Sequence, residues 1–531
     1  MHLITIQTKT VKMDKSYLLA IIATLCCLIS IAQHTTTPIH YTVSMKNPKD
    51  QRFQIQMDLN GFKEDTLELK LPNWSPGYYQ MMQYYENIED LKATHSDGTP
   101  IRIIQLKDNS WQLITKSDNN IHITYKVHAS KKFVANSLLD STRAYIVPPN
   151  NFLYPKGYLD APSLITITLE ENSKWDEIAT GLTPIDGYPN SFISKNFDIL
   201  YDSPLLIGDL ESLTPFQVRG KQHRFIGYQL GEFDRQDMME SLRKIIETCV
   251  EFFDDIPYDH YTFIGIGPGR GGIEHLNSTT VSFDGNTLKT QQDVDRMLNF
   301  LTHEYFHHYN AKRIRPFELG PFDYDKGSRT NQLWIAEGLT VYYEYIISKK
   351  AGIKDMKTFF SDLERHINAV ENNPGRYYQS LSQSSYNTWS DGPFGTMGKE
   401  KGKAISYYDK GPLVGLFLDL EIRKLTKNRA SLNDVMYKLY HKYYKGLNRG
   451  FTEAEFQRVC EQVAKSSLKE IFEYIYTTKE LDYKKYLGYA GLSLDTLPKN
   501  QNNQGIKSLK IKILQNQTPE QSALRNAWLN Q

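Results

Sequence analysis

Cysteine is scarce in this chain of 531 residues, which has four, two of them at positions 26 and 27. The other two, Cys249 and Cys460, lie far apart in sequence. Small exported proteins held together by disulfides are rich in cysteine, so this composition excludes a disulfide framework. The fold must instead be held by a packed core or by a metal. We expect Cys249 and Cys460 to be buried thiols, with a single disulfide as the alternative.

The chain also lacks an excess of charge of either sign. Its formal net charge is +1, from 62 basic and 61 acidic residues. Residues 1–32 hold three lysines and one aspartate, so the chain without them has a net charge of about −1. Neither value favours electrostatic capture of nucleic acid or of an anionic membrane. We therefore expect no nucleic-acid partner.

An apolar run at residues 17–32 follows Lys12 and Lys15. Ser30 and Ala32 place small residues at the −3 and −1 positions of a signal-peptidase site. The run is shorter than the roughly 20 residues that a membrane span needs. We expect residues 1–32 to be a cleaved signal peptide and the protein to be exported, either periplasmic or secreted. No stable membrane span is then expected, although an uncleaved signal would leave a membrane-anchored form.

The length predicts roughly three domains, and the first is rich in β structure. Alternating runs such as 53–57 and 121–125 are separated by Asp-Gly and Asp-Asn-Asn turn signals. Short strands at this spacing predict a β-sandwich or a saddle-like sheet. Residues 73–79 read Asn-Trp-Ser-Pro-Gly-Tyr-Tyr. We interpret them as a packed corner, with a substrate-facing loop as the alternative.

The pattern then becomes mixed and, from residue 334 to about 480, mainly helical. Residues 234–253 predict an amphipathic helix, and Thr290 with Asp293 predicts a capping box at the start of another. The segment 500–504 reads Asn-Gln-Asn-Asn-Gln, which is typical of a solvated linker or a weakly ordered tail.

Residues 267–272 match the glycine pattern G-x-G-x-x-G and follow a predicted strand at 261–266. A dinucleotide fingerprint must open a helix whose N-terminus binds the pyrophosphate. Residues 276–283 favour a strand instead. We therefore reject nucleotide binding and expect a flexible turn that exposes its backbone.

The strongest chemical signal is at residues 303–307, which read His-Glu-Tyr-Phe-His in a segment of helical periodicity. Positions i and i+4 share one face of a helix, so His303 and His307 can bind a single metal ion. Glu304 stands where its carboxylate can take a proton from a metal-bound water.

A catalytic zinc site needs a third protein ligand and leaves its fourth position open. Glu337 is an acidic residue in an otherwise apolar helical stretch, where an unpaired buried carboxylate is costly. Binding a metal would remove that cost. The alternative is an ion pair with a buried arginine.

Four motifs together resemble the glycyl aminopeptidase family of zinc metallopeptidases, which are gluzincins distantly related to the aminopeptidase N-like enzymes. They are Gly-Gly-Ile-Glu-His at 271–275, His-Glu-Tyr-Phe-His at 303–307, Trp-x-x-Glu-Gly-x-Thr-x-Tyr-Tyr-Glu at 334–344 and Tyr-Asp-Lys-Gly at 408–411. With Trp-Ser-Pro-Gly-Tyr-Tyr at 74–79, the resemblance covers about residues 37–495. Residues 312–333 form a longer loop before the third ligand than in aminopeptidase N-like enzymes, which favours the narrower family.

The resemblance implies that His303, His307 and Glu337 bind one Zn²⁺ per chain, with Glu304 as the general base. Zinc would lower the pKa of a bound water toward ~7, and Glu304 would accept its proton during attack on the peptide carbonyl. Tyr408 resembles the tyrosine that donates to the tetrahedral oxyanion. Its neighbour Tyr407 is the main competitor for that role.

Substrate binding is implied for three residues. Glu274 resembles the glutamate that binds the free α-ammonium of the substrate, a charge-assisted contact. Gly271 and Gly272 would let an extended substrate approach the backbone closely. His275 either packs or lines the pocket. His308 lies about 100° round the helix from His307, so we expect it to support the ligands or to lie at the surface.

The fold class that follows is a multidomain α+β protein, in which a short, incomplete PDZ-like tail replaces the PDZ domain that family members commonly carry. We predict a signal peptide at 1–32, an N-terminal β domain at 33–222, a thermolysin-like catalytic domain at 223–350, a helical part of the catalytic region at 351–490, and a truncated PDZ-like or disordered tail at 491–531.

The function that follows is that of an exported zinc metalloaminopeptidase acting on peptides. The resemblance implies a preference for small N-terminal residues, Gly or Ala. A zinc endopeptidase with the same site is one alternative, and a catalytically silent exported protein that binds peptide or glycan is another. The sequence leaves the oligomeric state open.

Overall fold

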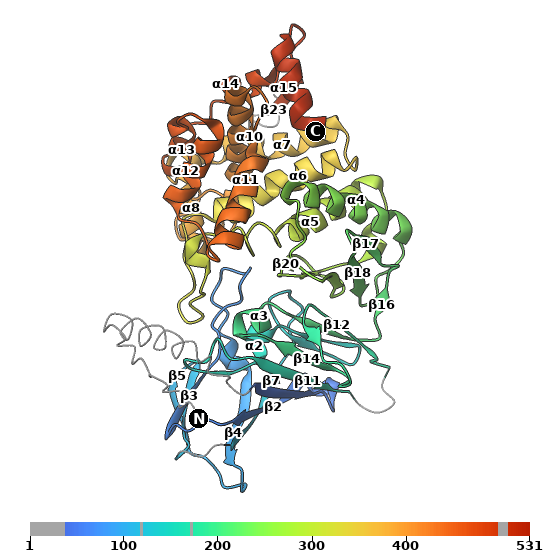
Figure 1. Cartoon of the computed structure of the whole chain (residues 1–531), viewed down its shortest axis with the longest axis vertical. Helices are drawn as coiled ribbons and strands as arrows, with labels where there is room; N and C mark the ends of the chain where they lie inside the picture. The colour runs from blue at the N-terminus through green and yellow to red at the C-terminus, as the bar shows by residue number, and fades with distance from the viewer. Residues whose placement is uncertain (1–37, 117–119, 170–173, 497–507, 531) are drawn as a thin grey trace, which may run out of the picture.

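The computed structural model describes residues 38–116, 120–169, 174–496 and 508–530 (Figure 1). The predicted signal peptide and the Asn/Gln-rich segment lie outside these residues. The chain forms a β-rich domain and, above it in Figure 1, a helical region, so the multidomain α+β class is confirmed. Nowhere in the described ranges does a helix combine the length and apolar character needed to span a membrane.

The β domain is built on a sheet with the strand order β13-β14-β11-β1-β2-β7-β4. Strands β1 and β11 pair in parallel, and the other pairs of this sheet are antiparallel. Alternate residues of β2 and β7 are buried, as their alternating sequence predicts. The strands are β1 Ile39–Ser44, β2 Arg52–Asn60, β4 Ile88–His95, β7 Asn120–His128, β11 Ser163–Thr168, β13 Thr183–Pro184 and β14 Ser191–Ser194.

Two smaller sheets complete the β domain, with orders β10-β3-β6-β5 and β12-β15-β9-β8. Their strands are β3 Thr66–Lys70, β5 Ile103–Lys107, β6 Ser110–Ile114, β8 Leu138–Leu139, β9 Arg143–Ile146, β10 Tyr154–Pro155, β12 Glu177–Thr180 and β15 Leu205–Gly208. Short helical segments lie between them: η1 Pro48–Asp50, η2 Tyr84–Asn87, α2 Pro148–Asn151 and α3 Phe197–Tyr201.

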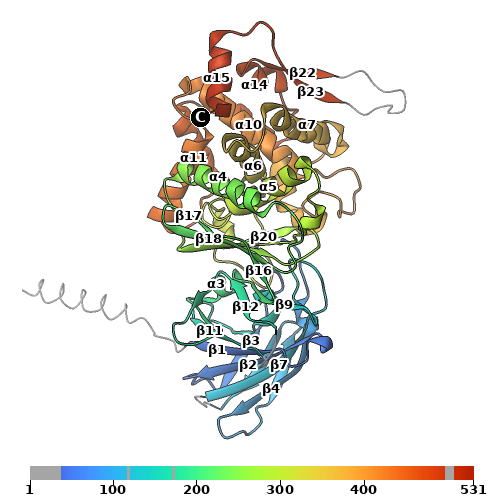
Figure 2. The same ribbon diagram turned by 90° about the vertical axis from the view of Figure 1, so that its right-hand side faces the viewer.

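A further sheet lies between the β domain and the helices (Figure 2). Its order is β16-β18-β19-β21-β20, with β17 also paired to β18, and β20 is an antiparallel edge strand. A strand follows the glycine turn at 267–271, as predicted, in place of the helix that a dinucleotide fingerprint opens. The strands are β16 Glu211–Ser212, β17 Phe216–Val218, β18 Lys221–Gly227, β19 His260–Gly265, β20 Gly272–Glu274 and β21 Ser278–Val281.

Helices cover this sheet and share one hydrophobic core. Cys249 and Cys460 are buried free thiols. The predicted Thr290–Asp293 capping box is present at the start of helix α5 Gln291–Phe306. The helices are α4 Arg235–Phe253, η3 Gly285–Thr287, α5 Gln291–Phe306, η4 Phe317–Leu319, η5 Trp334–Gly338, α6 Leu339–Lys350, α7 Met356–Asn372, η6 Pro374–Tyr377, α8 Leu381–Tyr386, α9 Thr388–Asp391, α10 Tyr407–Thr426, α11 Leu432–Leu439, η7 Tyr440–Gly446, α12 Glu453–Ala464, α13 Lys469–Tyr476 and α14 Tyr483–Tyr489.

The described part of the C-terminal segment packs onto these helices (Figure 2). Strands β22 Leu492–Thr496 and β23 Leu509–Ile513 pair antiparallel, and helix α15 Pro519–Asn530 follows. Trp528 on α15 is fully buried, and its indole N–H donates to the Tyr342 hydroxyl at 2.9 Å. The apolar residues of this segment thus extend the core of the catalytic helices. The PDZ-like interpretation stays a prediction.

Candidate active site

Two helical segments bring together three side chains that could hold one metal ion. Helix α5 carries His303, His307 caps the C-terminus of this helix, and the π-helical turn η5 carries Glu337. The two Nε2 atoms lie 2.9 Å apart, and Glu337 Oε2 lies 3.6 Å from His303 Nε2 and 3.3 Å from His307 Nε2. All three residues are buried. Single π-helical turns are frequent at functional sites, and this one directs a carboxylate at the two imidazoles.

The far side of each imidazole faces an acceptor. His303 Nδ1 lies 2.8 Å from Glu344 Oε2, and His307 Nδ1 lies 2.9 Å from the Asn310 carbonyl oxygen. Each Nδ1 must therefore carry its proton, so a neutral ring presents a lone pair at Nε2. Such hydrogen bonds are typical of metal-binding histidines.

The donor set fits a divalent cation. Burial alone would raise the pKa of Glu337, but the two imidazoles hold its pKa below its ordinary value, so it is an anionic group. One carboxylate oxygen and two imidazole lone pairs thus point at one place. Two histidines and a glutamate with an open position form a common catalytic zinc site.

Glu304 lies beside this triad without a hydrogen-bond partner for its Oε2 atom among the described residues. Burial raises the pKa of Glu304 to about 7. A Cβ atom on Gly272 would lie 2.8 Å from Glu304 Oε1 and 2.9 Å from Phe300 Cζ. The glycine at 272 therefore leaves room for Glu304, which is a base of suitable pKa with a free oxygen.

Tyr408 reaches the same group from the first turn of α10. Its hydroxyl donates to Glu337 Oε2 at 2.9 Å. The Tyr407 hydroxyl instead pairs with Thr388 Oγ1 at 3.1 Å. The structure thus places the hydroxyl of Tyr408, and not that of Tyr407, against a metal-ligand residue.

Glu274 ends the edge strand β20 and is 5% exposed. Gly77 of the β domain lies over its carboxylate, since a Cβ atom there would be 3.0 and 3.1 Å from the two Glu274 oxygens. Lys312 Nζ lies 3.8 Å from Glu274 Oε1. The adjacent Gly271 has a φ of +88°, which glycine adopts without strain.

A cavity of about 810 Å³ lies against His303, Glu304 and Tyr408 and is lined by both domains. Among its lining residues are Gly77, Tyr78, Tyr79, Gly271, Gly272, His303, Glu304, Tyr407 and Tyr408. Trp74 is fully buried, as the packed-corner interpretation predicts. The glycine and tyrosines after it, however, face the cavity, so this loop also contributes to the site.

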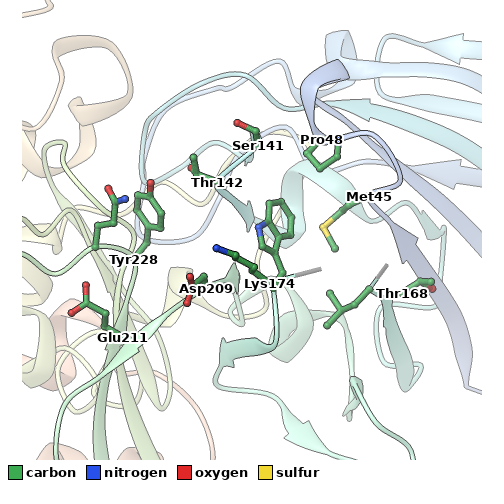
Figure 3. Close-up of a pocket in the computed structure, with 12 residues that line it drawn as sticks. Met45, Pro48, Ser141, Thr142, Thr168, Lys174, Asp209, Glu211 and Tyr228 are labelled. Carbon is green, nitrogen blue, oxygen red and sulfur yellow. The ribbon is translucent and has the colours of Figure 1, made fainter. Parts of the chain in front are cut away.

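A second cavity of about 530 Å³ lies where the β domain meets the sheet of the catalytic region (Figure 3). Met45, Thr168 and Lys174 come from the β domain, whereas Glu211 and Tyr228 come from the region of β16 to β18. No residue predicted from the sequence to act in catalysis lines it. The first cavity is therefore the candidate active site.

The structure differs from the interpretation of the sequence at His308 and adds four residues to which that interpretation gives no role. His308 is fully buried among aromatic rings and is not at the surface. Its Nδ1 atom faces the Tyr305 carbonyl oxygen at 2.5 Å, and His308 is not part of the cluster that could hold a metal ion. Glu344 closes the motif at 334–344 but has no predicted role, although its spacing of seven residues from Glu337 would place both on one helix face. No pattern in the sequence marks Asn310, Lys312 or Asp202.

The fold and this site define a class: the zinc-dependent metallopeptidases. The family model of the peptidase M61 N-terminal domain matches residues 40–209, and that of the M61 glycyl aminopeptidase matches residues 296–414. The chain belongs to the M61 glycyl aminopeptidase family. It is a peptidase hydrolase, and the metal indicated by the family and by the site is zinc.

Solved structures agree with this family. The chain is similar to an aminopeptidase N family protein from Idiomarina loihiensis, with 28% identity, coverage of 86% of this chain and 79% of the other, and a TM-score of 0.81. It shares the fold of an M1 zinc metallopeptidase mutant from Deinococcus radiodurans solved with a Tyr-Ser-Ala substrate, at 12% identity, 84% and 94% coverage, and a TM-score of 0.51. The comparison with curated protein sequences yields no significant match.

Proposed function

We propose that this protein is an exported zinc aminopeptidase that removes one small N-terminal residue, Gly or Ala, from peptides. His303, His307 and Glu337 hold one Zn²⁺ per chain in this proposal. The observation that carries it is the position of Glu274, a buried carboxylate on an edge strand beside the metal ligands. Export rests on the sequence of residues 1–32 alone.

Glu274 is suited to bind the α-ammonium of the substrate. A carboxylate forms a charge-assisted hydrogen bond with an ammonium, and burial strengthens the contact by excluding water. The edge of β20 offers unpaired backbone groups to an extended peptide. A peptide held in this way has its first peptide bond near the metal ligands, which favours cleavage after one residue.

The family name and the lining of the cavity support a small first residue. Phe133 and Tyr78 pack at 5.1 Å between ring centroids, and both line the cavity. Val134 lies 3.6 Å from a Cβ atom placed on Gly271. Val134 thus stands close to Gly271, and Tyr78 is the neighbour of Gly77 in the chain, an arrangement that favours a small N-terminal side chain.

Bound zinc would polarise the scissile carbonyl and lower the pKa of the attacking water. Glu304 accepts the proton of that water through its free oxygen and then donates it to the leaving amine. Tyr408 donates its hydroxyl hydrogen to the oxyanion that develops on the substrate carbonyl. In the absence of substrate this hydroxyl is held by Glu337, so it is already directed into the site.

The test uses a panel of aminoacyl reporters together with a measurement of zinc content. The zinc-loaded protein should cleave glycyl and alanyl reporters fastest, and Glu304→Gln should retain zinc but lose cleavage. Glu274→Ala should abolish cleavage of free-amine substrates. Equal activity of the wild type on N-terminally blocked peptides would favour an endopeptidase. A zinc-loaded protein that cleaves no substrate would favour a peptide- or glycan-binding protein.

A further inference from the structure

A buried charge pair lies behind Glu274. Lys312 Nζ is 2.7 Å from Asp202 Oδ1 and 3.8 Å from Glu274 Oε1, and the Lys312 and Asp202 side chains are each 9% exposed. Asp202 follows helix α3 of the β domain, whereas Lys312 follows the metal-binding helix α5. This cluster therefore joins two domains directly beside the proposed ammonium site.

The cation in this cluster is charged despite its burial. Burial disfavours the ammonium, but the carboxylates of Asp202 and Glu274 together raise the pKa of Lys312 above its ordinary value. Burial likewise opposes an ionised Asp202, yet Lys312 and then His275 hold the pKa of Asp202 below its ordinary value. Lys312 and Asp202 thus neutralise each other.

The other two carboxylates nearby have roles of their own at the metal site. Glu337 belongs to the metal-ligand set and Glu304 faces Gly272 beside the metal ligands. Among the described residues of this cluster, Glu274 is therefore the carboxylate whose charge Lys312 leaves uncancelled, since Lys312 lies closer to Asp202. A net charge of −1 at this place matches the single positive charge of an α-ammonium.

The β domain also holds the backbone around Glu274. Asp202 Oδ2 accepts a hydrogen bond from the Leu276 N–H at 2.7 Å, and Asp202 Oδ1 lies 3.2 Å from His275 Nδ1. The Asn277 side chain donates to the Gly181 carbonyl oxygen at 2.9 Å. The turn that follows Glu274 is thus fixed by side-chain and backbone groups of the other domain.

We propose that Asp202 and Lys312 are positioning residues for substrate recognition, because Asp202 keeps the Lys312 ammonium from pairing fully with Glu274 and so leaves Glu274 available to the substrate ammonium. This inference rests on the proposed aminopeptidase function. It makes the β domain a part of the substrate-recognition machinery.

The experiment measures the contribution of the amine to binding. The zinc-loaded full-length protein is titrated calorimetrically with glycine hydroxamate and with acetohydroxamate, which bind metal alike and differ in the α-amine. The Kd of acetohydroxamate divided by the Kd of glycine hydroxamate, called the Kd ratio below, reports the ammonium site alone. A large Kd ratio means that the α-amine strengthens binding. Loss of zinc or a general distortion would weaken both ligands, whereas loss of the ammonium site weakens only glycine hydroxamate.

Asp202→Asn should lower this ratio by about tenfold, because the uncompensated Lys312 ammonium then pairs with Glu274. The double variant Asp202→Asn/Lys312→Met removes that ammonium, so its ratio should return to within about threefold of the wild type. An unchanged ratio in Asp202→Asn, or no recovery in the double variant, would overturn the proposal. If Asp202→Asn does not fold, a double variant whose Kd ratio is tenfold below that of the wild type overturns the proposal.

Asp419→Asn is the matched control. Asp419 is also buried, accepts from Arg423 Nε at 3.0 Å and from the Leu432 N–H at 2.9 Å, and lies on α10 away from Glu274. Its ratio should equal that of the wild type. Glu274→Ala separates the aminopeptidase function from the positioning role of Asp202 and Lys312. If the Kd ratio of Glu274→Ala is as large as that of the wild type, the aminopeptidase assignment itself is contradicted. A ratio that falls in Glu274→Ala but not in Asp202→Asn contradicts only the role of the pair.

Discussion

Gly338 and Gly411 meet so closely that neither can carry a side chain. A Cβ atom on either glycine would lie 2.7 Å from the Cα atom of the other. Gly338 follows the proposed metal ligand Glu337, and Gly411 lies one turn after Tyr408. This contact between η5 and α10 therefore sets the 2.9 Å hydrogen bond from Tyr408 to Glu337. It explains why both motifs contain a glycine at this place.

Replacing Gly411 with alanine should separate the two helices. We expect a loss of about 1–3 kcal/mol in the free energy of unfolding, because the added methyl group overpacks the contact. Activity should fall further than stability, since Tyr408 and Glu337 move apart. Urea unfolding and kcat measure the two effects. Gly488→Ala is the control: no atom lies within 4 Å of its Cβ position, so it should leave kcat unchanged.

Zinc affinity should depend on Glu344, which accepts the hydrogen bond from His303 Nδ1. Glu344→Ala should weaken zinc binding roughly 10–100-fold, because outer hydrogen bonds fix the orientation and raise the basicity of metal-binding histidines. Competition with a chelator measures the affinity. Glu344→Gln keeps an acceptor oxygen and should lose less. Equal affinities in all three proteins would contradict the role of Glu344.

Much of this site could be predicted from the sequence, because its residues lie in local patterns. The spacing of His303 and His307 requires only a helix, and Glu337 stands out as a charge in an apolar stretch. Asp202 and Lys312 could not be predicted in this way. They come from different domains, and only tertiary packing brings them together, 110 positions apart in the chain.

The loop of Trp74 shows the same limit in another form. Its aromatic residues predict a packed corner, and Trp74 is fully buried. That Gly77 lies over Glu274, however, depends on how the β domain docks onto the edge strand β20. A periodic pattern within one segment carries no information about that docking. Of the two alternatives for His308, the surface position is wrong for a related reason, since the aromatic rings that bury it come from several elements.

Tyr408→Phe should reduce kcat by roughly 10²–10³-fold with little change in KM, as expected for loss of a donor to the oxyanion. Zinc content should stay at the wild-type level, because the phenol donates to Glu337 without binding the metal. Tyr407→Phe provides the comparison, since its hydroxyl pairs with Thr388. A larger kcat loss in Tyr407→Phe would reverse the assignment of the two tyrosines.

Stability should fall in mild acid because of His223, which is fully buried and whose Nε2 atom lies 2.8 Å from the Tyr258 hydroxyl. Burial lowers the pKa of His223 to about 4. Between pH 6.5 and 4 the unfolded chain binds a proton that the folded protein does not, so stability decreases as pH falls. Unfolding free energies at pH 7 and 5 should differ by about 2 kcal/mol more in the wild type than in His223→Phe.

Gly77→Ala should block the ammonium site from the side of the β domain. The new methyl carbon would lie 2.8 Å from Ile273 Cγ2 and 3.0 Å from Glu274 Oε2, so it would occupy space against the carboxylate. Its φ of +92° also strains any residue other than glycine, by roughly 1–2 kcal/mol. Gly187→Ala separates the two effects, because Gly187 has a φ of +79° and no atom within 4 Å of its Cβ position. Both variants should lose similar stability, whereas only Gly77→Ala should raise KM for glycyl substrates, by about tenfold. A rise in KM in both variants would mean that backbone strain, and not contact with Glu274, limits substrate binding.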